Sequence, residues 1–301
     1  LDRILPEVQR LTPALVIVDS IQTIRHAALD ALAGNVSQVR ACTQALVQLA
    51  KTRGPAVLLV GHVTKDGALA GPRTLEHMVD VVLYLEGQSE RPQRLLRSVK
   101  NRFGAVHEIG LFQMEESGLQ AVDNPSALFL QERVPDAPGT VVFPGQEGSR
   151  PLLVEIQALV AEGAPGYARP TAVGLDPNRV SLLRAVIEKH LGDGLTGFEV
   201  YLNVVGGLRL TEPAVDAAVV AALLSSFRNR ALDPHTVVLG EVGLTGELRS
   251  VRGLAERLGE AGRLGFTRAL APRPTSPISL PAGIALHPVG NIRELADALF
   301  G

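Results

Sequence analysis

Two short runs of apolar residues limit the fold of this chain more than any other feature of its sequence. The first covers residues 14–18, Ala-Leu-Val-Ile-Val, and ends at Asp19; the second covers residues 56–61. Continuous apolar runs of this length are typical of strands that are buried on both faces of a parallel sheet. Between them, a helical pattern starts at Ser37 as the N-cap and ends near Arg53, before Gly-Pro. Strand, helix and strand in this order predict a right-handed α/β unit.

The rest of the 301 residues separates into two patterns, as expected for a chain of two domains. Residues 131–150 are rich in proline and glycine. We therefore predict a first domain over 1–135, a linker over 136–150 and a second domain over 151–301. In the first domain we further expect a helix at 73–77, strands at 79–85 and 94–99, and a hairpin of 109–114 with 118–121. In the second, an α+β pattern, we expect strands at 152–159, 199–205, 236–240 and 269–271, and helices at 179–190, 214–227, 254–264 and 293–300.

Composition excludes several kinds of protein. The net charge of −2 provides no overall basic field, so any nucleic-acid site must be a local patch. The single cysteine, Cys42, allows no disulfide within the chain and no zinc site of the CxxC type, and its helical context favours a small buried side chain over a nucleophile. No apolar run approaches membrane-spanning length and no signal peptide is visible, so we expect a cytoplasmic protein that makes no membrane contact. Because the sequence starts at Leu1 rather than at methionine, we also expect further sequence upstream.

Asp19 is the first candidate site residue. Open α/β sheets bind ligands at the carboxyl ends of their strands, and an acid there can hold the Mg²⁺ that bridges nucleotide phosphates. The alternative is a core strand that ends in aspartate without function, which is common, and the motif alone does not exclude it.

Longer motifs identify a family. Asp19-Ser-Ile-Gln-Thr, Val60-Gly-His-Val-Thr-Lys-Asp-Gly, Ala70-Gly-Pro and, most specifically, Lys100-Asn-Arg-Phe-Gly104 closely resemble the RadA/Sms family, and the resemblance covers essentially the whole chain. Residues 124–130 also fit it. The resemblance implies a DNA-dependent ATPase of homologous recombination and DNA repair. Such a protein binds single-stranded and branched DNA, promotes branch migration, forms a homo-hexameric ring and works with the RecA recombinase, using ATP and Mg²⁺.

The resemblance also implies roles for single residues. Asp19, with Ser20, would hold nucleotide and Mg²⁺, and His62 would sense the γ-phosphate. The loop 64–72, with Lys65 and the following Arg73, would face DNA inside the ring. Lys100 and Arg102 would reach the nucleotide of the neighbouring subunit, as arginine fingers do. Without the resemblance, Lys100 and Arg102 could be solvated loop charges; Asn101 and Phe103-Gly104 nevertheless favour a tight turn.

One departure from the family pattern affects function. No GxxxxGK[ST] segment occurs in these residues, so the phosphate-binding loop and its lysine are missing. In the family this loop lies upstream, as do the catalytic glutamate and a four-cysteine zinc finger, which would be the only zinc site. We therefore expect the intact protein to hydrolyse ATP and this chain to be ATPase-deficient.

The second half resembles the proteolytic domain of Lon, a fold also found in ribosomal protein S5, with matching runs at 210–225, 240–248 and 253–257. The overall fold class is therefore α/β, a partial RecA-like core followed by an α+β Lon-protease-like domain. A serine–lysine dyad needs a hydroxyl and an amine, whereas Ala214 and Ala255 occupy the two positions. We predict an inactive domain that serves as a ring scaffold, not a peptidase.

Arginines of the second half could form a local DNA-binding patch. Binding would then rely on phosphate contacts, because aromatic residues are only 4% of the chain. The opposing interpretation is that nearby glutamates neutralise these arginines. An oligomerising, DNA-binding module without catalysis is the alternative function, and a Lon-type peptidase the less favoured one. The candidate residues are Arg228, Arg230, Arg249, Arg252 and Arg257.

Overall fold

The structure, a computed structural model, describes residues 1–62, 72–87, 92–106, 108–163 and 169–301. It divides into two compact units, Leu1–Ile109 and Gly110–Gly301. The predicted fold class is confirmed, since a parallel α/β element is followed by a mixed α+β sheet. The division lies well before residue 135, where the sequence pattern placed the end of the first domain.

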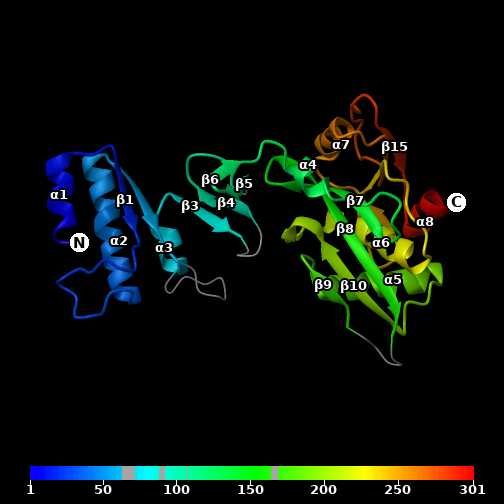
Figure 1. Cartoon of the computed structure of the whole chain (residues 1–301), viewed down its shortest axis with the longest axis horizontal. Helices are drawn as coiled ribbons and strands as arrows, with labels where there is room; N and C mark the ends of the chain where they lie inside the picture. The colour runs from blue at the N-terminus through cyan, green and yellow to red at the C-terminus, as the bar shows by residue number, and fades with distance from the viewer. Residues whose placement is uncertain (63–71, 88–91, 107, 164–168) are drawn as a thin grey trace. The chain divides into compact units, whose positions relative to one another are not determined.

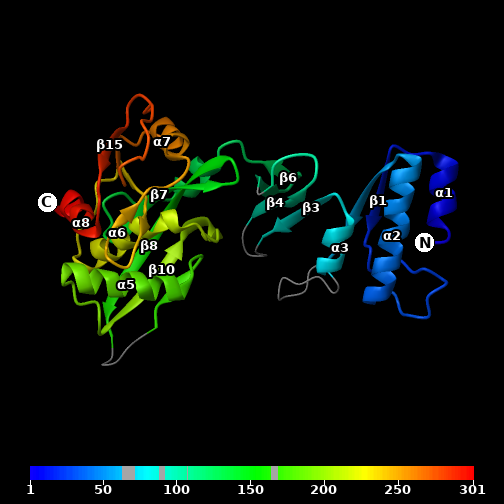
Figure 2. The same ribbon diagram turned by 180° about the vertical axis from the view of Figure 1, so that it is seen from behind.

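The first unit is built on two parallel strands. β1 (Leu15–Asp19) pairs with β2 (Ala56–Val60) in a register that sets Asp19 opposite Val60. α2 (Val36–Arg53) connects the strands, and α1 (Ile4–Leu11) contacts α2 (Figures 1 and 2). The helix begins one residue before Ser37, because Asn35 is its N-cap and accepts a hydrogen bond from the Ser37 N–H. Both residue types cap helices well, so the sequence alone did not decide between them.

Only one face of this small sheet is covered by the described residues. Val18 packs into a core with Leu46 and Cys42 of α2, and Val16, Val57 and Leu59 lie against that core. On the other face Leu15, Ile17 and Leu58 are 51%, 59% and 48% exposed. Parallel strands are normally covered on both faces, so this apolar face is incomplete as it stands.

The remaining elements of the first unit are α3 (Pro72–Met78), β3 (Val81–Glu86) and β4 (Gln93–Asn101). β3 and β4 pair antiparallel, with an irregularity between Val82 and Leu83. In the second unit, β5 (Ile109–Glu115) and β6 (Gly118–Ala121) form the predicted hairpin.

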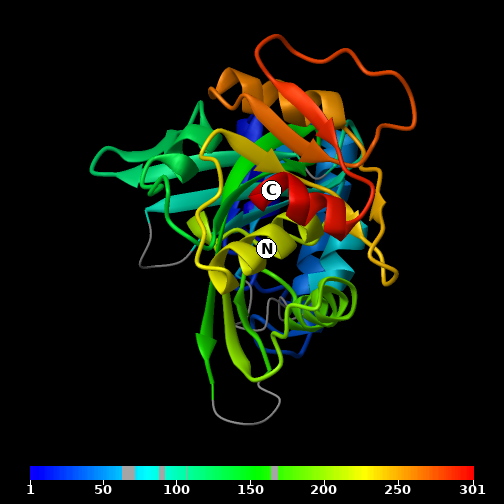
Figure 3. The same cartoon turned by 90° about the vertical axis from the view of Figure 1, so that its right-hand side faces the viewer.

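The second unit contains a seven-stranded mixed sheet in the order β15-β14-β11-β7-β8-β10-β9. Residues 152–156 of β8 are all buried, so both faces of that strand are covered, and α4, α6 and α7 contact it. α6 also contacts α5 and α8, as the view in Figure 3 shows. The elements are α4 (Pro125–Leu130), β7 (Thr140–Glu147), β8 (Arg150–Glu162), β9 (Thr171–Val173), α5 (Pro177–Leu191), β10 (Phe198–Val204), η1 (Val205–Gly207), η2 (Pro213–Val215), α6 (Asp216–Phe227), β11 (Thr236–Val238), β12 (Glu241–Val242), β13 (Leu248–Arg249), α7 (Leu254–Arg263), β14 (Arg268–Ala271), β15 (Ala285–Pro288) and α8 (Ile292–Phe300).

The segment predicted as a linker, 136–150, is largely a strand instead. β7 lies inside the sheet, between β8 and β11, and Val141, Val142 and Phe143 are at most 2% exposed. Pro144 is tolerated because the N–H that it lacks would not face β8; its carbonyl also faces away from β8 and accepts from Arg257. The proline and glycine content concealed a short apolar run.

β14 and β15 are parallel, yet residues 272–284, which connect them, contain no helix. None of the helices in the described ranges is long and apolar enough to cross a membrane.

Candidate functional site

The polar residues Asp19, Ser20, Gln22 and His62 gather at the carboxyl ends of β1 and β2. The Ile21 N–H donates to the Val60 carbonyl at 2.9 Å and keeps the chain beside β2 after the strand ends. Gln22 Nε2 donates to the His62 carbonyl at 3.3 Å, which joins the two strand ends directly. Asp19 and His62 are exposed, whereas Ser20 is only 4% exposed.

This edge offers oxygen atoms to a ligand. The side-chain oxygen Oε1 of Gln22 is buried and has no hydrogen-bond partner. A carboxylate, a hydroxyl and a free amide oxygen are the donors that Mg²⁺ and its water ligands prefer. The described residues contain no group of three or more His, Cys, Asp or Glu side chains that could hold a metal alone. The edge therefore fits a metal ion that a phosphate ligand also binds.

A buried glutamine holds the loop that leaves this edge. Gln38, on α2, is fully buried; its Nε2 donates to the carbonyls of His26, Leu29 and Ala31, and its Oε1 accepts from the His26 N–H at 2.8 Å. One side chain thus fixes several turns of backbone between β1 and α2. The loop has no regular secondary structure, so these hydrogen bonds take the place of helix or strand pairing.

The Lys100–Gly104 run forms the tight turn that the sequence predicted. Asn101 Oδ1 accepts from the Phe103 N–H at 3.0 Å, and Asn101 Nδ2 donates to the Ala105 carbonyl at 3.2 Å. Arg102 pairs with Asp80 through its side chain at 2.9 Å and donates its N–H to the Asp80 carbonyl at 3.1 Å. The turn holds Phe103 81% exposed.

Lys100 is not a free loop charge. It is half-buried on β4, and its Nζ donates to the carbonyl of Glu76 in the last turns of α3, where a cation is favoured by the helix dipole. Arg102, by contrast, is 52% exposed, and its guanidinium pairs with Asp80 through Nη1. Both side chains are thus oriented by contacts within their own unit.

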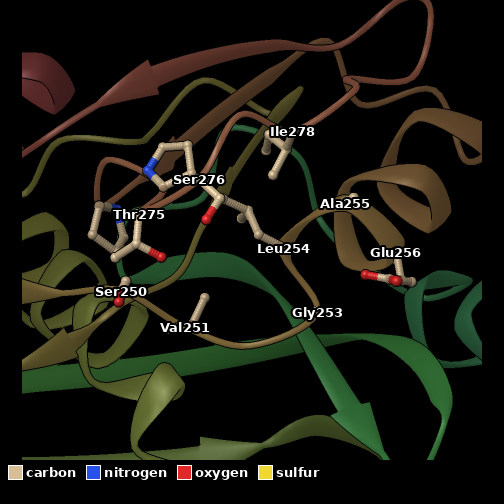
Figure 4. Close-up of a pocket in the computed structure, with 11 residues that line it drawn as sticks. Ser250, Val251, Gly253, Leu254, Ala255, Glu256, Thr275, Ser276 and Ile278 are labelled. Atoms are coloured by element: carbon tan, nitrogen blue, oxygen red, sulfur yellow. The ribbon is translucent and has the colours of Figure 1, made fainter.

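In the second unit, Ala214 and Ala255 lie at the two positions where the resemblance to Lon predicts the serine and the lysine of a dyad. Ala214 lies in η2 and is 5% exposed; Ala255 is in the first turn of α7. Ala255 lines a pocket of about 280 Å³, whose two walls are residues 250–256 and part of residues 272–278 (Figure 4). Ala214 is not among the lining residues. Neither methyl group can donate or accept a proton.

Two ion pairs flank these positions. Arg257 is 3% exposed and binds Glu212 with both ends of its guanidinium, at 2.6 and 3.1 Å. Asp216 is fully buried, accepts from the Val242 N–H at 3.1 Å, and is paired with Arg179. Burial raises the pKa of Asp216, and the hydrogen bond from Arg179 opposes that shift.

Comparison with known proteins shows the family of the chain. No family model matches the chain. It is similar to the DNA repair protein RadA of Streptococcus pneumoniae (strain R6), with 48% identity over 295 residues, 98% of this chain and 70% of the relative. This chain belongs to the RadA family. The same-named proteins of Halalkalibacterium halodurans and Synechocystis are 45% and 50% identical, over 100% and 97% of this chain. The chain spans 66% and 58% of their lengths, so these RadA proteins are longer than the chain.

The structure brings together some of the residues to which the family resemblance gives a role. Asp19, Ser20 and His62 do come together at one sheet edge. Lys65 lies outside the described residues, and for Arg73 only the backbone, in α3, is described. The reach of Lys100 and Arg102 to a neighbouring subunit stays a prediction.

The candidate DNA-binding arginines of this RadA relative differ in how they are engaged. Arg249 pairs with Glu241 and Glu247, as the opposing interpretation supposed. Arg228 pairs with Asp193, and both Arg228 and Arg230 lie over the Phe300 ring, at 5.0 and 5.4 Å from its centre. The Arg252 side chain is exposed, and among the described residues it forms no hydrogen bond or ion pair.

Arg257 was wrongly placed in the surface patch, because it is buried against Glu212. Sequence analysis also missed Gln22, Gln38 and the Asp216–Arg179 pair. A signal existed for Asp216, the only charged residue in the otherwise apolar α6. Gln22, Gln38 and Glu212 carry no such signal, since polar residues of these types are common on surfaces.

Proposed function

We propose that the intact protein is a DNA-dependent ATPase of homologous recombination and DNA repair, which binds single-stranded DNA and promotes branch migration. The family supports the coarser role, since the relatives are named DNA repair proteins. The observation that carries the ATPase proposal is the polar edge of β1 and β2. There Asp19 and Ser20 meet His62, and the free Gln22 oxygen lies beside them.

In this proposal, each residue of the edge has a role. Asp19 and Ser20 hold Mg²⁺ and the nucleotide, and Gln22 ties the β1 end to the β2 end so that His62 keeps its place. When bound, Mg²⁺ bridges the phosphates and neutralises their charge. Lys100 and Arg102 supply positive charge from a neighbouring subunit. Their turn is rigid before any neighbour arrives, which limits the entropy lost on assembly.

The bare face of β1 and β2 supports a larger motor core. Leu15, Ile17 and Leu58 are about half exposed, and covering them would stabilise the sheet. The relatives are longer than this chain. We propose that additional chain of the intact protein covers this face and provides the phosphate-binding loop. The 301 residues alone are then ATPase-deficient.

We further propose a homo-hexameric ring in the cytoplasm that acts with the RecA recombinase on single-stranded and branched DNA. The Lon-like unit would be the ring scaffold. Among the candidate arginines of the predicted patch, Arg252 is the best placed to contact DNA phosphates, and Arg230 follows, because neither is paired with an acid among the described residues. Arg228 and Arg249 would have to exchange a carboxylate for a phosphate.

Mixing two inactive variants of the full-length protein tests the central claim. Asp19→Asn removes the metal-holding carboxylate, and Lys100→Ala removes the charge proposed to act in trans. Each variant alone should form rings, bind DNA and hydrolyse no ATP. Mixed rings contain interfaces in which an intact Asp19 faces an intact Lys100, so DNA-stimulated turnover should return on mixing.

Lys51→Ala, on the exposed surface of α2, is the matched control and should keep full turnover. Normal turnover by Lys100→Ala would refute the role of Lys100. Loss of turnover without recovery on mixing would refute action in trans, while leaving Asp19 in place.

The alternative is an oligomerising, DNA-binding module without catalysis, which could describe the 301 residues by themselves. Anisotropy of a labelled single-stranded oligonucleotide across a salt series separates the two. Binding by this chain without nucleotide, weakening steeply with salt, would show a phosphate-reading surface independent of the motor. The Lon-type peptidase is disfavoured, because neither Ala214 nor Ala255 carries a reactive group.

A further inference from the structure

The outer edge of β7 is closed by side chains where a strand could be added. β7 pairs with β8 along its whole length, but its other side meets β11 only at Val142. Beyond that point the backbone groups of Pro144 and Gln146 point away from β8, in the same direction as those of Val142. Without other partners, these backbone groups would form an open strand edge.

Glu212 and Arg257 occupy that edge. Arg257 Nη1 donates to the Pro144 carbonyl at 2.9 Å, and Glu212 Oε1 accepts from the Gln146 N–H at 2.9 Å. The two side chains also bind each other at two points. Together they satisfy one acceptor and one donor that an incoming strand would use. Pro144 offers no N–H, so it adds nothing for such a strand to bind.

The plug is built firmly. Arg257 is 3% exposed, and its Nε donates to the Arg252 carbonyl at 2.9 Å. Its guanidinium is therefore bound by Arg252, Pro144 and Glu212. Glu212 Oε1 is shared between Arg257 and the Gln146 N–H. A bidentate arginine–carboxylate pair in a buried setting is geometrically specific and leaves neither charge unpaired.

The position of the plug relates it to the lost dyad. Glu212 precedes Ala214 by two residues on the segment that leads into η2, and Arg257 follows Ala255 by two residues on α7. The pair therefore joins the same two segments that a serine–lysine dyad would join. One common way in which extended polypeptides bind proteins is to add a strand to an open sheet edge.

We infer that Glu212 and Arg257 form a plug on the β7 edge beyond Val142, which excludes extended polypeptides from this edge, between the two segments that carry Ala214 and Ala255. At this edge the unit rejects peptides by blocked binding, and not only by its missing nucleophile. Installing serine at 214 and lysine at 255 would therefore restore no peptide binding here. This inference is independent of the proposed ATPase and DNA roles.

The test is peptide binding by full-length protein in which the plug is removed. The variant Glu212→Ala with Arg257→Ala deletes both charges together, so that no buried charge is left alone. The probe is a fluorescein-labelled peptide of alternating valine and threonine with terminal lysines, measured by fluorescence anisotropy. We expect the double variant to bind it about tenfold more tightly than the unmodified protein, the scale of two recovered backbone hydrogen bonds. Hydrogen exchange at the Gln146 amide should slow when peptide is added.

The matched control removes the other buried pair, Arg179→Ala with Asp216→Ala, whose hydrogen bonds join the two residues to each other and to Val242 and not to β7. This control loosens the same unit but should gain no peptide binding. Glu212→Gln with Arg257→Met provides a milder opening should the alanine variant not fold: it keeps most of the side-chain volume and removes both charges, and some gain in binding is expected. The inference is overturned if a folded plug variant, either of the two double substitutions, binds no better than the unmodified protein. Equal gain by the control variant, or no slowing at Gln146, would also overturn it.

Discussion

Removing Arg179 should destabilise the second unit strongly, because it leaves a carboxylate without its counter-charge. Asp216 is fully buried in the first turn of α6, and Arg179 contacts both of its oxygens while also donating to the Val242 carbonyl at 2.8 Å. Breaking a buried pair by deleting one partner costs about 3–5 kcal/mol. Since the Arg179 side chain is 34% exposed and water can reach the vacated site, we expect about 3 kcal/mol for Arg179→Ala.

Urea denaturation followed by circular dichroism measures this loss, with hydrogen exchange of the α6 amides reporting on the second unit. For an m-value of about 2 kcal/mol per molar urea, the midpoint should fall by about 1.5 M. Arg249→Ala is the matched control: Arg249 also forms two ion pairs with carboxylates, but it is 58% exposed and should change the midpoint little. Similar midpoints for the two variants would refute the reasoning that burial decides the cost.

The pH dependence gives a second check. The folded-state pKa of Asp216 is raised by burial, so the folded protein binds this proton more tightly than the unfolded chain. Ionised Asp216 therefore reduces stability as pH rises from the unfolded pKa through the folded pKa, and below both values the penalty is absent. Deleting Arg179 removes the group that opposes the shift, so the window extends further upward. The deficit of Arg179→Ala should shrink between pH 7 and pH 4, and adding Asp216→Asn should also reduce it. A deficit that is constant with pH contradicts this account.

Three other predictions follow from local geometry. Gly206→Ala should lower the free energy of unfolding by about 3 kcal/mol in urea denaturation, because φ is +86° and a new Cβ would lie 2.4 Å from the ring of buried Phe129. The control Gly192→Ala has a similar φ but open space around the new Cβ, and it should lower the free energy of unfolding by only about 1 kcal/mol. The pKa of Glu247 is lowered to about 2, first by the hydrogen bond from the Thr245 hydroxyl and also by Arg249. Ionised Glu247 should therefore stabilise the folded protein fully above pH 4.5, and this contribution should vanish as pH falls towards 2. A carboxyl NMR titration should show that Thr245→Val raises this pKa, and an unchanged pKa would contradict the cause given. Gln38→Ala should cost about 2 kcal/mol and speed exchange of the His26 amide, whereas Gln44→Ala, exposed on the same helix, should do neither.

The sequence predicted those parts of the fold that depend on local pattern. The apolar run ending at Asp19, the helix that follows and the 109–121 hairpin have short-range signals, the turn after Lys100 has a weaker one, and all are present. β7 was missed because its strand character depends on pairing with β8 and β11, which lie elsewhere in the sequence.

The same reasoning explains the site. The candidate edge was predictable, because carboxyl ends of parallel strands meet at one side of a sheet. The pairing of Glu212 with Arg257 was not, because 45 residues separate them and each resembles an ordinary surface charge. Arg257 was therefore assigned to solvent, whereas the fold closes over it. Charge partners distant in sequence are set by packing, which no local pattern records.

The connection between β14 and β15 offers a practical opening for experiments in living cells. Its residues 273–283 form none of the observed backbone–backbone hydrogen bonds, and the two strands it joins are paired independently of it. Loops of this kind accept inserted sequence without disturbing the sheet. A small epitope or a self-labelling tag placed near residue 279 would leave both chain ends untouched. The protein could then be followed at sites of DNA damage by microscopy with its termini free for whatever they contact.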